Sequence, residues 1–249
     1  MHSSAEEGTL NFYVTPELSE NQQACNERYF QSVLPPYATE KLMLKMQSAN
    51  AEAKKIKINT HTAYTNVTGG GYGQEAEEAD PTLKYSLDEL IERPEIIELT
   101  EYETRTVTLD LNMPQEAFEG FLAGGLRVSE IKEEASEETT DEERSVIQNE
   151  FTYIIGVVVN NNQDVVQPDL DLLDVFANQL NYRNEISANL QNFTPTFVNC
   201  LDVEAMVQKE DKEEILYQAS QERMQMAPNF NFNFPISLGG DHFRSGEIC

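Results

Sequence analysis

Carboxylate and amide side chains suited to calcium follow the most apolar stretch of the chain. Asn160, Asn162, Asp164 and Asp171 stand at the first, third, fifth and twelfth positions of a calcium-binding loop. The sixth position, which needs glycine for a sharp turn, is Val165, and the twelfth is Asp in place of Glu. These departures favour a polar loop that ends in a helix cap, and they leave calcium binding at this loop open.

A second motif, Gly-Gly-Asp-His, ends at His242. It resembles a segment of the arginase and agmatinase family, in which the Asp-His pair helps to hold two manganese ions. The resemblance implies a metal-dependent hydrolase with Asp241 and His242 as ligands. That family also needs an Asp-x-His-x-Asp cluster, and the only other histidines here are His2 and His61. A two-metal site cannot be assembled from this inventory, so a metal-dependent hydrolase is the second alternative only.

The remaining candidates for catalysis are weak. A nucleophile needs an adjacent base, and His61 lies between Thr60 and Thr62, which are ordinary strand residues. The glycine-rich segment 69–73 lacks the Lys-Ser/Thr of a phosphate-binding loop. The absence of tryptophan also disfavours a sugar site. We therefore predict a protein that is not an enzyme, with no catalytic, metal or cofactor-binding residues.

The charge of the chain limits its partners. It carries 17 Lys and Arg against 44 Asp and Glu, a formal net charge of −27. Nucleic acids and anionic membrane surfaces are bound mainly through basic side chains, so we expect direct contact with neither. No window has the roughly 18 continuous apolar residues of a transmembrane segment.

The elements that must position these residues follow from the apolar pattern. The segment 151–159 has a single polar side chain and predicts a strand buried on both faces at the centre of a sheet. Further extended segments are expected at 54–68, 96–113, 185–207 and 229–236. Helical patterns are expected at 15–34, 39–53, 86–93, 114–123, 168–180 and 211–226, with Ser86 capping the third.

Strands and helices are thus mixed without a repeating order. The pattern predicts an α+β fold with a mainly antiparallel or mixed β-sheet core and several helices. The alternative is a β-sandwich or jelly-roll-like fold with helical insertions. We expect a single globular domain over residues 1–249, with an acidic excursion at 130–144 and a C-terminal arm at 228–249.

The arm alternates strictly between two residue types. Phe230, Phe232 and Phe234 lie on one side of an extended strand and asparagines lie on the other. A soluble monomer rarely leaves three aligned aromatic rings in water. We therefore expect these three residues to carry an interaction, either with the sheet of their own chain or with the sheet edge of a neighbour.

The missing catalytic constellation and the aromatic arm lead to a functional hypothesis. We interpret the chain as a structural subunit of a virus or phage particle, a capsid, shell or other virion component. Its partners would be copies of itself and other subunits of the same assembly, and its location the virion, with the cytoplasm as the alternative. The competing hypothesis is an acidic binding module, such as a nucleic-acid-mimicking inhibitor of a basic protein.

Overall fold

Strands make up nearly all of the regular structure. The computed structural model describes residues 11–23, 28–73, 80–131, 151–209, 212 and 214–240. Within these residues there are strands β1 to β16 and one helix, α1 (Leu87–Leu90). The expected α+β fold with several helices is therefore wrong, whereas the β-sandwich alternative is compatible with the structure.

The N-terminal lobe is a sandwich of two sheets. The first sheet has the order β1 (Phe12–Glu17), β3 (Thr39–Ser48), β9 (Thr104–Asn112) and β7 (Ile91–Glu92). The second has the order β2 (Phe30–Val33), β11 (Thr152–Asn160), β10 (Leu122–Glu130), β4 (Lys54–Thr62) and β8 (Ile97–Leu99). Only β2 and β11 pair in parallel among these strands. Alternate apolar residues of both sheets form one core between them.

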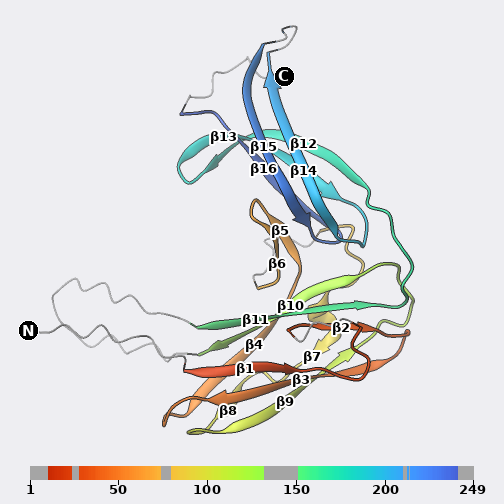
Figure 1. The fold of residues 1–249 in the computed structure, drawn as a ribbon, viewed down its shortest axis with the longest axis vertical. Helices are drawn as coiled ribbons and strands as arrows, with labels where there is room; N and C mark the ends of the chain where they lie inside the picture. Colours follow the sequence, from red (N-terminus) through yellow and green to blue (C-terminus); the bar gives the residue numbers. More distant parts are fainter. Residues whose placement is uncertain are drawn as a thin grey trace, which may run out of the picture.

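The C-terminal lobe is a smaller sandwich. One sheet has the order β12 (Leu170–Leu180), β13 (Arg183–Asn192) and β16 (Phe230–Ser237). The other is the hairpin of β14 (Val198–Gln208) and β15 (Ile215–Met226). Residues from β13, β14, β15 and β16 form a second core, separate from the first. Figure 1 shows the two lobes one above the other, with the short hairpin of β5 (Tyr64–Asn66) and β6 (Gly69–Gly71) between them.

Five of the six helical predictions are wrong, because an apolar spacing of three or four residues also occurs in strands. In β3 the buried residues are Leu42, Leu44 and Met46, at a spacing of two. In β12 a bulge between Leu172 and Asp174 shifts the alternation by one residue and produces a helix-like spacing. The helix at 86–93 is confirmed as the short α1, whose Glu89 N donates to Ser86 Oγ at 3.4 Å.

The strand predicted at 151–159 is confirmed as β11, but its expected position is wrong. β10 occupies the centre of the five-stranded sheet, and β11 lies beside it. Ile155 and Val157 are buried in the core, whereas Ile154 is 54% exposed on the opposite face. This second face of β11 is therefore available to line a site.

The two lobes contact each other through small side chains and hydrogen bonds. Ala63, Ala123 and Ala227 form a third buried cluster at the junction. Ala227 N donates to Thr65 Oγ1 at 2.9 Å, and Asn231 Nδ2 donates to the buried Asp80 carboxylate at 2.8 Å. The single-domain prediction states that the chain is one folding unit, held together by contacts such as these. It stays a prediction. Most of the acidic excursion at 130–144 lies outside the described residues.

Candidate functional site

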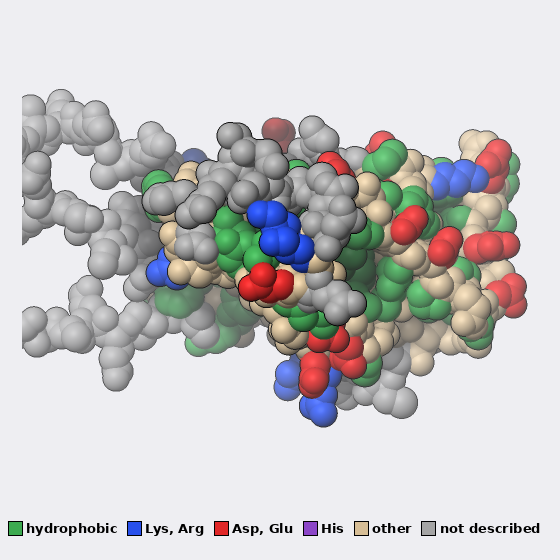
Figure 2. Space-filling view, turned by 90° about the horizontal axis from the view of Figure 1, so that it is seen from above, with side chains coloured by type: hydrophobic (Ala, Val, Ile, Leu, Met, Phe, Trp, Pro, Cys, Tyr) green, Lys and Arg blue, Asp and Glu red, His purple; other side chains and the backbone are tan. Residues whose placement is uncertain are grey.

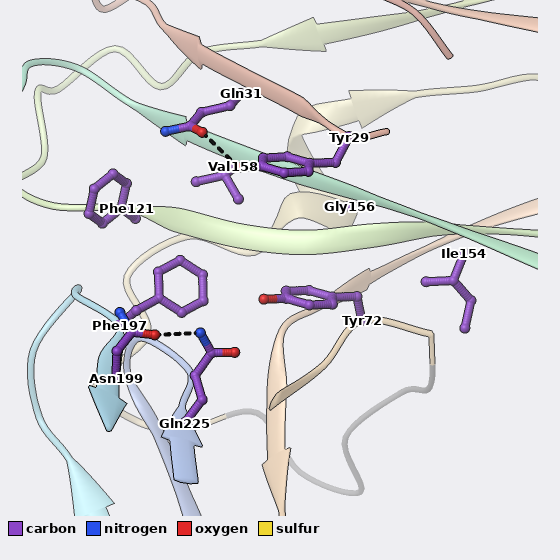
Figure 3. A pocket seen from close by; sticks show the side chains of 10 residues that line it. All are labelled: Tyr29, Gln31, Tyr72, Phe121, Ile154, Gly156, Val158, Phe197, Asn199 and Gln225. Carbon is purple, nitrogen blue, oxygen red and sulfur yellow. Dashed lines mark hydrogen bonds between the residues drawn. The ribbon is translucent and has the colours of Figure 1, made fainter. Parts of the chain in front are cut away.

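A cavity of about 420 Å³ lies at the junction of the lobes. This volume is within the range of roughly 300–1,000 Å³ that is typical of small-molecule sites. Its lining comes from both lobes and contains no charged side chain (Figure 3): Tyr29, Gln31, Tyr72, Phe121, Ile154, Gly156, Val158, Phe197, Asn199 and Gln225.

The outward face of β11 forms one wall of this cavity. Alternate residues of a strand point to the same side, so Ile154, Gly156 and Val158 share this face. A Cβ atom at position 156 would lie 3.3 Å from the Tyr29 Cβ, so glycine leaves room for Tyr29 against the strand. On the neighbouring strand, a Cβ at Gly125 would lie only 2.4 Å from the Tyr72 carbonyl oxygen. Both glycines thus allow a tyrosine-bearing segment to approach the sheet closely.

Four aromatic side chains enclose the cavity from different segments. Tyr29 precedes β2, Tyr72 follows β6, Phe121 precedes β10 and Phe197 precedes β14. The Phe121 and Phe197 rings lie with their centroids 6.1 Å apart and tilted by 46°. Figure 3 shows the Tyr72 ring on the other side of the open space from Phe197. Burial raises the pKa of the Tyr72 phenol, and proximity to Tyr29 raises it further, so Tyr72 remains a neutral hydroxyl donor at neutral pH.

Amide side chains supply the remaining polar groups. Gln225 Nε2 donates to Asn199 Oδ1 at 2.6 Å, and the Tyr29 hydroxyl donates to Gln31 Oε1 at 3.1 Å (Figure 3). These bonds orient Asn199 and Gln31 and engage their oxygen atoms, which leaves their NH₂ groups to serve as donors. Apolar rings combined with neutral amides suit a ligand that has both apolar faces and uncharged polar groups.

The residues of the calcium-like loop are engaged in local hydrogen bonds. Asn160 is buried and donates through Nδ2 to the Asn162 carbonyl, while Asn162 Oδ1 accepts from Asp164 N at 3.1 Å. Asp171 lies in β12, where its Oδ1 accepts from the next backbone N–H. In the described parts of the chain, no group of three or more His, Cys, Asp or Glu residues could hold a metal ion. Asp241 and His242 lie outside the described residues.

The three phenylalanines of the arm lie in β16. Phe232 and Phe234 are 5% and 2% exposed in the core of the C-terminal lobe, and Phe230 packs at the junction of the lobes. A strand exchanged between two copies of the chain would make the same contacts in its partner. The interaction role of these residues therefore stays a prediction.

The sequence analysis missed the residues that line the cavity. The segment 69–73 was considered only as a candidate phosphate-binding loop, yet it brings Tyr72 to the site. Phe197 was taken as part of an extended stretch. No local pattern distinguishes these rings from core residues, because they meet only when segments distant in sequence fold together.

Two family models match the chain in tandem. The peptidoglycan binding domain of the WxL interacting proteins matches residues 12–130, and the host binding domain of the same proteins matches residues 142–247. Each model covers a little under half of the chain, and together they cover most of it. The matches define a bacterial cell-surface binding protein built from two β lobes. The two lobes of the chain are thus similar to the two domains of the WxL interacting proteins.

Several solved structures resemble the chain at low similarity. A chain from a chaperone–tip adhesin complex of CFA/I fimbriae is 13% identical, with a TM-score of 0.39, over 94% of this chain and 91% of that chain. The class 5 fimbriae chaperone CfaA is 11% identical, with a TM-score of 0.37, over 94% and 88%. A chain of the CsuC–CsuE pre-assembly complex of Acinetobacter baumannii pili is 11% identical, with a TM-score of 0.37, over 88% and 87%. No curated protein matches significantly. TM-scores below 0.5 do not establish a common fold, so the assignment depends on the family models.

The family assignment corrects the functional hypothesis. The chain is associated with the bacterial cell surface and is not a virion component, so the capsid interpretation and the virion location are wrong. The cytoplasmic alternative has no support either. The family is named for its interaction with other proteins, which agrees with the expectation of protein partners in its general form. Within the described residues, no helix is long and apolar enough to cross a membrane.

Proposed function

We propose that this chain attaches to the bacterial cell wall by binding peptidoglycan glycan in the cavity between its lobes. It acts by binding and not by catalysis. The uncharged aromatic and amide lining of the cavity is the observation that carries this proposal. The family model over residues 12–130, a peptidoglycan binding domain, supports it.

The chemistry of the lining selects one part of peptidoglycan. Sugar rings have apolar C–H faces that stack on aromatic rings, and their N-acetyl groups exchange hydrogen bonds with amides. The stem peptides carry carboxylates, which would enter a cavity without a cation on a chain of net charge −27. The glycan strand is therefore the better ligand. The lack of tryptophan does not oppose this, since two tyrosines and two phenylalanines supply the rings.

Binding to purified cell-wall sacculi tests the proposal. The full chain should co-sediment with sacculi, and oligomers of N-acetylglucosamine should release it. Tyr72→Ala and Phe197→Ala each remove one stacking surface and should weaken binding by about tenfold, as for about 1.4 kcal/mol of lost contact. Tyr182→Ala is the matched control, because Tyr182 is 98% exposed on a distant turn.

Two results would contradict the proposal. One is co-sedimentation of both cavity variants at wild-type affinity with unchanged melting temperatures. The other is binding to sacculi that oligomers of N-acetylglucosamine do not displace, which would place the contact elsewhere.

The family name adds protein partners to the proposed function. The model over residues 142–247 is a host binding domain, so the C-terminal lobe is the part proposed to contact another protein. Self-association of the chain, which the sequence analysis predicted, stays a proposal beside this one.

A further inference from the structure

Strand β12 presents an unusual edge to solvent. Among the strands that the structure describes it pairs only with β13, so its other side is the open edge of a three-stranded sheet. Ten of its eleven residues are exposed, and its large apolar side chains are 37% to 51% exposed: Leu170, Leu172, Leu173, Val175, Phe176 and Leu180. A long apolar edge is a template for pairing with another strand, and proteins normally block such edges.

Three backbone N–H groups on this edge are capped by the strand's own side chains. The turn at Asn181 and Tyr182, both with positive φ, sets the ladder so that the N–H groups of Gln179 and Val175 point away from β13. Asn178 Oδ1 accepts from Gln179 N, and Asp174 Oδ1 accepts from Val175 N, each at 2.8 Å.

Beyond the bulge the same device recurs, because Asp171 Oδ1 accepts from Leu172 N at 2.8 Å. These caps satisfy the edge N–H groups of Leu172, Val175 and Gln179. A rotation of each side chain about χ1 is enough to remove them. The caps thus hinder the pairing of β12 with other strands in general, and a change of side-chain rotamer is enough to expose the capped N–H groups.

The charges along β12 indicate which kind of partner strand can displace the caps. Four acidic residues and no basic residue occur between positions 164 and 182: Asp164, Asp169, Asp171 and Asp174. A partner strand that displaces the caps releases the carboxylates of Asp171 and Asp174, which then require cations. A second copy of the same edge brings only more carboxylates. Figure 2 shows acidic side chains among exposed apolar ones on this end of the molecule, with few basic side chains.

The inner face of β12 defines the apolar part of the partner. Val175 lies opposite Ala188, and Ala177 lies opposite Ile186, both of which belong to the core of the C-terminal lobe. Residues directly opposite in a ladder share a face, so this side of β12 continues the core toward solvent. Alternate apolar residues of an added strand would extend that core.

We propose that β12 accepts an extended strand of a partner protein in which apolar residues alternate with Lys or Arg. The partner's backbone carbonyls replace the Asp and Asn caps on the edge N–H groups, and its basic side chains pair with the released Asp171 and Asp174. This edge belongs to a different lobe from Tyr72 and Phe121, so the proposal does not depend on glycan binding.

A designed peptide tests the proposal on the full chain. The probe is a twelve-residue peptide that alternates valine and lysine. One control peptide has the same side chains with its central residues N-methylated, which prevents ladder formation, and another has glutamate in place of lysine. We expect only the first to bind, and to slow hydrogen exchange at the amides of Val175, Ala177 and Gln179.

Charge-neutral variants of the chain separate pairing from general attraction. Asp171→Asn with Asp174→Asn retains oxygen caps and removes both charges, so the affinity for the valine–lysine peptide should fall by about tenfold, as for two exposed ion pairs. Glu204→Gln with Glu222→Gln removes the same charge from the exposed hairpin of β14 and β15 and should leave the affinity unchanged.

Three results would overturn the proposal. Equal binding of the N-methylated peptide would show attraction by charge alone. Protection that appears away from β12 would place the contact elsewhere. Protection of β12 in the free protein that grows with its concentration would show that a second copy occupies the edge.

Discussion

At the scale of single residues, Lys54 and Glu130 form a buried ion pair in the N-terminal lobe. Lys54 Nζ and Glu130 Oε1 are 2.9 Å apart, and their side chains are 3% and 16% exposed. Asn11 Nδ2 donates to the other carboxylate oxygen at 3.1 Å. The pair connects the first residue of β4 to the last residue of β10, so it fixes the ends of two adjacent strands.

Glu130→Ala should leave the Lys54 ammonium buried without its counter-charge. The expected loss in the free energy of unfolding is about 3 kcal/mol, as for other broken buried pairs. Urea denaturation measures it, and the double variant Lys54→Met with Glu130→Gln should recover part of the loss. Glu116→Ala, which breaks the exposed pair with Lys84, is the control and should have little effect. Equal effects of the Glu130 and Glu116 variants would contradict this prediction.

Two single residues show where residue type alone is misleading. Gly124 directly follows the helix predicted at 114–123, but it lies in β10, where a Cβ would lie 2.1 Å from the His61 carbonyl oxygen. Cysteine is commonly buried, whereas Cys200 is exposed. In both cases the residue type has a common role that the surrounding strands override.

At the scale of elements, β11 belongs to the core on one face and to the cavity on the other. Ile155→Asp places a charge without a partner in the N-terminal core, so we expect loss of soluble, folded protein. Ile154→Asp changes the neighbouring residue, which is 54% exposed, and should fold. Soluble expression and circular dichroism distinguish the two variants. A folded Ile155→Asp protein with an unchanged melting temperature would exclude β11 from the core.

Elements were predicted well where the alternation of apolar residues is regular. β4 falls within the segment predicted from its two-residue period, and β16 extends one residue beyond its predicted segment. β12 and β15 were predicted as helices, and the ladders of both contain bulges. A bulge changes the phase of a strand, and nothing in the local sequence marks it before the partner strand is known.

At the scale of the whole molecule, the junction of the lobes is expected to make them unfold together. Thr65 Oγ1 accepts a buried hydrogen bond from Ala227 N across the junction. Thr65→Val removes the acceptor and leaves a buried N–H unsatisfied, which costs about 1–3 kcal/mol. We expect the protein to unfold in a single thermal transition. In the Thr65→Val variant, the free energy of opening measured by hydrogen exchange should fall equally for core amides of β10 and of β13.

The control for this variant is Thr108→Val on the exposed face of β9. Two separate transitions, or destabilisation of β13 alone, would show that the lobes are independent units.

Repeating the thermal melt at several protein concentrations tests whether the C-terminal arm is exchanged between copies. A midpoint that rises with concentration would show that β16 is exchanged between copies.

The sequence by itself determined that the chain is acidic, because net charge depends only on composition. That the chain does not bind nucleic acid stays a prediction from this charge. The sequence also determined the strands with a regular two-residue period, because that period is a local property of an amphipathic strand. The tertiary structure decided which strands pair, where the bulges lie and which face of β11 stays open. It also decided that Tyr72, Phe121 and Phe197 meet at one cavity. These features depend on contacts between segments far apart in the chain, which the apolar pattern of any single segment does not encode.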